Sequence, residues 1–124
     1  MKRNYIVKVT KNSRKFLLVE FDSSSCQSLS NFLNSEVHNF YTHIYKELEA
    51  VVTGQKEASE FGGNILNIDI GKEETEVYYQ MDDESLGEPY FISTDELYKL
   101  VIEWKEMKDR MRRGEDIFPV TIDD

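Results

Sequence analysis

Disulfides, long hydrophobic runs and recognisable catalytic motifs are all missing from this sequence. Cys26 is the only cysteine among 124 residues, so no disulfide can form within the chain, which suits a reducing compartment. No window approaches the roughly 20 apolar residues that cross a bilayer. Polar residues interrupt the N-terminus at once, and it contains no signal-peptide hydrophobic region. We therefore expect a cytoplasmic protein.

Basic residues are also too few to balance the acids. The formal net charge is −9 and the pI is near 4.7. Such a chain repels phosphate backbones and anionic lipid, which argues against nucleic acid and membranes as partners and favours a basic protein. The hydrophobic fraction of 40% is enough for one core, and the length suits one domain over residues 1–124.

The N-terminal half predicts a hairpin followed by a helix. Residues 4–10 and 16–21 read as two strands around a polar turn. Residues 29–52 carry one helical stripe, with a break expected near Asn34-Ser35 and a stop at Gly54. The apolar positions of that stripe are Leu29, Phe32, Leu33, Val37, Phe40, Ile44, Leu48 and Val51. Residues 55–64 read as a polar connection.

The C-terminal half predicts a second hairpin, a short strand and a capped helix. Residues 66–70 and 77–81 alternate apolar and polar side chains around a glycine-containing turn. Residues 89–92 suit a short strand, and Ser93 followed by Glu96 forms a capping box for a helix that ends at Gly114. The tail allows an extended segment over residues 117–122. The fold class expected is α+β, with a mainly antiparallel sheet of about five strands and two main helices packed on one face.

Residues with catalytic or metal-binding chemistry do not form a known pattern. His38 and His43 are five positions apart, so they do not share the helix face that a zinc pair needs. Cys26 has no flanking nucleophile signature, and Gly62-Gly63 lacks a phosphate-binding pattern. The acids at 82–84 lack the ligand spacing of an EF-hand loop. We expect no metal site, no cofactor and no enzymatic activity. The position of Trp104 on an apolar helix stripe predicts core packing.

The acidic residues are concentrated in one part of the chain. Residues 56–97 contain twelve acids and two bases. One interpretation is a solvated face that keeps the protein soluble. The other is a docking face on which carboxylates steer a basic partner and a tyrosine supplies contact area. For that docking face we nominate the following residues: Asp69, Glu74, Glu76, Tyr78, Asp82, Asp83 and Glu84.

Residues 90–111 combine a strand, a Ser/Thr cap and a helix of the pattern Leu…Leu…Trp-Lys, after an acidic strand pair. This segment resembles the C-terminal element of small bacterial immunity proteins, which neutralise polymorphic or contact-dependent toxins. The likeness covers residues 64–111. It implies a one-to-one inhibitor of a basic toxin, often a nuclease, that blocks the toxin by occlusion. No partner contact carries over residue by residue, and the oligomeric state stays open.

Two other functions are compatible with the sequence. The chain could be a regulatory, adaptor or self-associating module that uses the stripe over residues 97–111 as an interface. An enzyme would require the fold to join Cys26, His38 or His43 with a carboxylate in a deep pocket.

Overall fold

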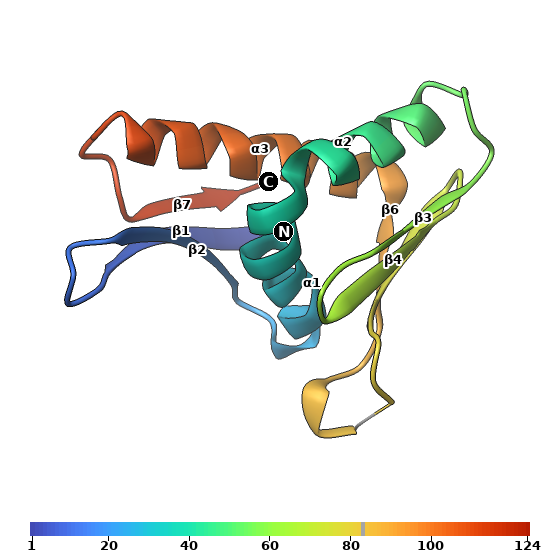
Figure 1. The fold of residues 1–124 in the computed structure, drawn as a ribbon, viewed down its shortest axis with the longest axis horizontal. Helices are drawn as coiled ribbons and strands as arrows, with labels where there is room; N and C mark the ends of the chain where they lie inside the picture. Colours follow the sequence, from blue (N-terminus) through green and yellow to red (C-terminus); the bar gives the residue numbers. More distant parts are fainter. Residues whose placement is uncertain (83) are drawn as a thin grey trace.

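The computed structural model describes residues 1–82 and 84–124, and within them the strands form two antiparallel sheets (Figure 1). The first sheet has the order β2-β1-β7 and the second has the order β3-β4-β5-β6. The strands are β1 (Lys2–Val9), β2 (Lys15–Phe21), β3 (Ser59–Gly62), β4 (Leu66–Ile70), β5 (Glu74–Tyr79), β6 (Tyr90–Ser93) and β7 (Val120–Asp123).

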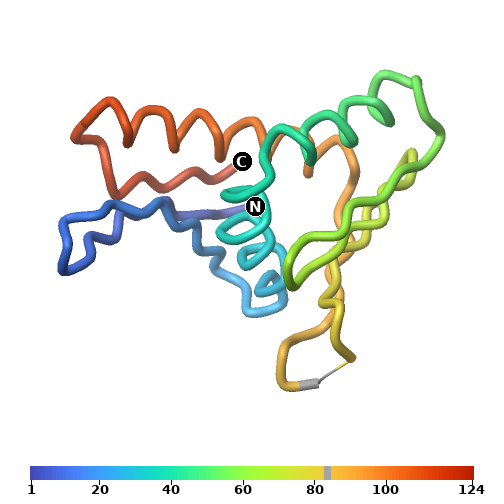
Figure 2. The backbone as a smooth tube through the Cα atoms, viewed as in Figure 1, coloured from blue at the N-terminus to red at the C-terminus, as the bar shows by residue number. Residues whose placement is uncertain are grey.

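The helical elements connect and cover these sheets. They are α1 (Gln27–Asn31), a π-helical segment η2 (Phe32–Val37), α2 (His38–Val52) and α3 (Thr94–Arg112), with short 3-10 turns at η1 (Ser24–Cys26) and η3 (Glu84–Leu86). The α1–η2 stretch lies between the two sheets, and α3 runs alongside the first sheet and crosses α2 (Figure 1). Because β1 and β7 pair antiparallel, the two ends of the chain lie side by side (Figure 2).

The predicted α+β class with antiparallel pairing is confirmed, but the single sheet of about five strands is wrong. The described residues form seven strands in two sheets, and the helices do not share one face of one sheet. β3 was read as a polar connection because Phe61 is its only buried residue. β7 is a half-exposed edge strand, so its alternation is weak. Edge strands bury little surface, and their sequences therefore show little pattern.

The two predicted helices are present, and their apolar stripes face the core. Trp104 is fully buried, as its place on the α3 stripe predicted. The Ser93 hydroxyl accepts a hydrogen bond of 3.4 Å from the Glu96 amide, which is one half of the predicted capping box. The first helical stretch is interrupted at η2 and again at Phe40, whose backbone is non-helical.

A buried carboxylate joins the interrupted helix to the second sheet. Glu36 lies in η2, is 0% exposed, and accepts hydrogen bonds of 2.7–2.9 Å from the backbone amides of Asn64, Ile65 and Leu66. These amides belong to the turn that enters β4. A Cβ atom on Gly63 would lie 2.3 Å from the Glu36 carboxyl carbon, so this turn needs a glycine to come so close. The connection between η2 and the turn into β4 thus uses one acid and one glycine.

We expect Glu36→Ala to lower the free energy of unfolding by about 3 kcal/mol, because buried amides that lose their acceptor are costly. Gly63→Ala should destabilise for the same reason, since its methyl group displaces the carboxylate. The two losses should not add: Gly63→Ala should cost little in a protein that already carries Glu36→Ala. Chemical denaturation of the double-mutant cycle measures this coupling.

Gly62→Ala provides the matched control for that cycle. The nearest atom to its Cβ is the Asn67 side-chain oxygen at 3.3 Å, on the exposed face of the sheet. Gly62→Ala should lower the free energy of unfolding by no more than about 0.5 kcal/mol. Strict additivity of Glu36→Ala and Gly63→Ala would show that the carboxylate does not hold the turn.

Candidate functional site

An acidic row crosses the outer face of the second sheet at one level of its register. Glu60 in β3 pairs with Asp69 in β4, Asp69 pairs with Glu76 in β5, and Glu76 pairs with Phe91 in β6. Paired residues of antiparallel strands point to the same face. Each of these residues has a buried neighbour in its own strand, such as Phe61 in β3 and Ile68 in β4, on the inner face of the sheet. The sheet therefore presents three carboxylates and one phenylalanine in line.

The row lines a shallow groove of about 410 Å³. Glu74, near the start of β5, adds a fourth carboxylate to its wall, and the β3 end contributes Ser59. Phe91 is 56% exposed, although a phenylalanine gains free energy when it is buried. The groove thus combines concentrated negative charge with an apolar side chain that is exposed to solvent.

The electrostatics of this face are unfavourable for the isolated protein. Asp69 stands directly opposite Glu76, and like charges in that position repel. Tyr78, one register level away, donates a hydrogen bond of 3.2 Å to Asp69. Partial burial raises the pKa of Tyr78, and the neighbouring charges of Asp69 and Glu76 raise it further. The phenol therefore stays protonated at neutral pH and acts as a donor to Asp69.

The structure brings together only part of the nominated residues. Asp69, Glu74 and Glu76 line the groove, and Tyr78 adjoins it on the same face. Asp82 is exposed beyond the end of β5, at the opposite end of that strand from Glu74.

The structure does not place the side chains of two nominated residues, Asp83 and Glu84, relative to the groove. Asp83 lies outside the described residues. Glu84 is described only as the first backbone position of η3. The groove and the loop after β5 are thus separate parts of the nominated surface.

Two residues of the row, Glu60 and Phe91, are not among those nominated from the sequence. Glu60 falls in the segment predicted as a connection, because β3 shows little alternation. The direction of Phe91 could have been predicted, since Phe91 and Ile92 are adjacent in a strand and point to opposite faces. With Ile92 buried, Phe91 has to be exposed.

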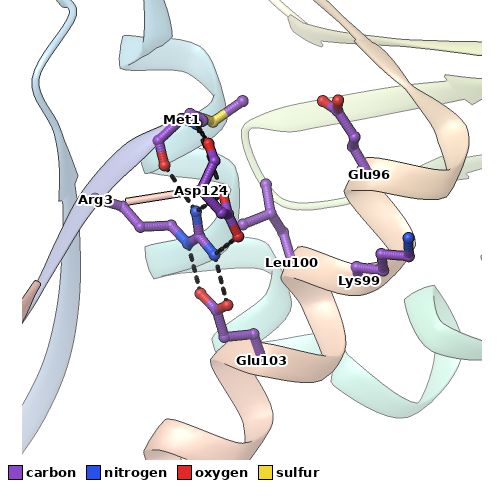
Figure 3. A pocket seen from close by; sticks show the side chains of 7 residues that line it. All are labelled: Met1, Arg3, Glu96, Lys99, Leu100, Glu103 and Asp124. Atoms are coloured by element: carbon purple, nitrogen blue, oxygen red, sulfur yellow. Dashed lines mark hydrogen bonds and ion pairs between the residues drawn. The ribbon is translucent and has the colours of Figure 1, made fainter. Parts of the chain in front are cut away.

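A second pocket, of about 480 Å³, lies where the first sheet meets α3 (Figure 3). Arg3 dominates it, and its guanidinium donates to both carboxylate oxygens of Glu103 at 2.6 and 2.7 Å and to Asp124 at 2.9 and 3.0 Å. The Tyr5 hydroxyl also donates to Glu103, at 2.7 Å. Arg3 lowers the pKa of Asp124 to about 2. These charges satisfy one another, and the cluster ties β1 and β7 to α3.

The residues considered for catalysis do not meet in one pocket. His38 and His43 line a pocket between α2 and α3, whereas Cys26 lines another beside Ser23 and Glu20. In residues 1–82 and 84–124, no three His, Cys, Asp or Glu side chains are grouped so that they could hold a metal ion. No helix within the same residues is long and apolar enough to span a bilayer.

Comparison with known proteins gives one informative similarity. A Bacillus cereus protein named "Immunity protein" is 27% identical over 88 residues, which cover 71% of this chain and 75% of that protein. No family model matches the chain, and no solved structure matches it.

Removing one charge of the row should stabilise the isolated protein. We expect Glu76→Gln to raise the free energy of unfolding by about 0.3 kcal/mol, because it relieves the repulsion across β4 and β5. The gain should disappear in 1 M NaCl, where the screening length falls to about 3 Å. Denaturant titration at both salt concentrations measures it. Asp116→Asn, in the exposed tail, is the charge-matched control, and an equal gain there would assign the effect to net charge alone.

Proposed function

We propose that this chain is an immunity protein, a non-catalytic binding protein that neutralises a basic toxin by covering it with the acidic groove of the second sheet. The observation that carries the proposal is the row of Glu60, Asp69, Glu76 and Phe91 across four paired strands. The similarity to a protein named "Immunity protein" supports the same function.

The composition of the groove suits such an interface. Its carboxylates attract a basic surface over several ångströms and accelerate encounter. Where the toxin is a nuclease, these groups occupy the positions of nucleic-acid phosphates. Phe91 is exposed in the isolated protein, and a bound partner would bury it. Apolar side chains buried in this way carry much of the affinity in protein interfaces. Tyr78 adds area and a hydrogen-bonding group beside it.

The spacing of the row favours one kind of partner element. Adjacent strands lie about 4.8 Å apart, so the three carboxylates span about 9.6 Å. An α-helix laid across the strands presents a side chain at each turn, about 5.4 Å apart, and spans about 10.8 Å. An extended strand presents same-face side chains about 6.7 Å apart and spans about 13.4 Å. A helix with basic residues on successive turns therefore matches the row better.

Charge reversal in the groove should break the complex without unfolding the protein. We expect Glu76→Lys to weaken binding of the cognate toxin by about 100-fold, because like charges meeting at an interface cost several kcal/mol. Phe91→Ala should weaken it by about tenfold or more. The toxin is captured from lysate of the source cells at low and moderate salt, identified by mass spectrometry, and then titrated as a purified protein by calorimetry.

Glu106→Lys is the matched control, since Glu106 is exposed on α3 and the charge change is identical. The affinity of the Glu106→Lys variant for the toxin should stay close to that of the wild type. Capture of no basic partner from cells in which the toxin is confirmed to be expressed would contradict the proposal. Equal losses for Glu76→Lys and Glu106→Lys would remove the groove as the binding face.

A further inference from the structure

The pocket that His38 and His43 line has a volume of about 370 Å³ and lies between the start of α2 and the middle of α3. The charged side chains that line it are all basic. Its lining residues are His38, Asn39, Phe40, Tyr41, Thr42, His43, Trp104, Lys105 and Lys108. No aspartate or glutamate is among them, although acids outnumber bases in the chain by 24 to 15. The pocket shares no residue with the acidic groove.

Lys108 is the central group of this pocket, and it forms no ion pair within residues 1–82 and 84–124. It is only 9% exposed, and its Nζ lies 3.2 Å from Nδ1 of His38 and 5.2 Å from the centre of the Trp104 ring. Among the residues that the structure describes, no carboxylate lies within ion-pair distance of it, whereas Lys105 pairs with Asp109 at 2.8 Å. A buried cation without an anion is costly.

Within the described residues, Lys108 and Trp104 both keep hydrogen-bond donors that have no protein partner. An ammonium carries three donors, and His38 accepts one of them. The indole Nε1 of Trp104, a fully buried residue, has no partner within the described part of the chain. The basic surroundings also perturb both bases. Burial, then the charges of Arg112 and Lys105, lower the pKa of Lys108, and the charge of Asp109 opposes this shift without cancelling it. Burial, then the charges of Lys108 and Arg112, lower the pKa of His38.

We propose that this pocket binds a small oxyanion, such as a phosphate or carboxylate group, through the ammonium of Lys108. An oxyanion accepts hydrogen bonds from the remaining donors of the ammonium and neutralises the buried charge. A metal cation would be repelled by Lys105 and Lys108, and an apolar ligand would leave the donors unpaired. The site is independent of toxin binding, and either can fail without the other.

Trp104 is the only tryptophan in the chain, so its fluorescence reports directly on this pocket. Titration with sodium phosphate should give a saturable change in emission and raise the melting temperature, whereas sodium chloride at equal ionic strength should do neither. Lys108→Met keeps the apolar stem and should weaken phosphate binding at least about tenfold. Lys108→Arg should retain binding, and Lys99→Met, an exposed change on the same helix, should leave it unaltered.

A parallel titration with sodium acetate distinguishes the ligand classes. Tighter binding of phosphate assigns the site to phosphoryl groups, and tighter binding of acetate assigns it to carboxylates. If Lys108→Met does not fold, Lys108→Gln gives the same comparison. The absence of a saturable response to both anions would overturn the proposal, as would equal phosphate affinity in the wild type and the folded Lys108 variant.

Discussion

The arrangement of the second sheet depends on the buried carboxylate of Glu36. Three backbone amides of the turn into β4 donate to it, and Gly63 leaves the space in which it fits. Holding the first residue of β4 fixes the position at which the apolar side of that strand packs against the core. Leu66 is buried there and Asp69 is exposed. The strand that Glu36 anchors thus carries one member of the acidic row on its outer face.

Three groups of charged residues differ in how their charges are paired. Arg3 is almost fully buried and has carboxylate partners on two elements, so its charge holds the first sheet to α3. The carboxylates of the acidic row stand opposite one another, and Lys108 is buried with no ion pair to any carboxylate in the described part of the chain. The last two arrangements cost stability in the isolated protein. The binding functions proposed for both places would offset this cost, because a ligand or partner would bring the opposite charge.

Much of the local structure was predictable because it depends on neighbours in sequence. The N-terminal hairpin, the hairpin of β4 and β5, and the Ser93 cap of α3 all follow from alternation, turn residues and capping chemistry. The outward face of β4 and β5 was predictable for the same reason. The sequence predicts a polar connection where β3 lies and only an extended segment over residues 117–122 where β7 lies, because edge strands bury few side chains.

The sequence by itself determined the acidic character of residues 56–97, the outward direction of Asp69, Glu76 and Tyr78, and the burial of Trp104, because charge and periodicity are local properties. Only the tertiary structure decided that Glu60 and Phe91 complete one row with them, since strand order and register join residues from four separate segments. It also decided that Lys108 contacts His38, because the crossing of α2 and α3 sets that contact. Long-range pairings of this kind depend on the whole packed chain, and they leave no signature in the spacing of neighbouring residues.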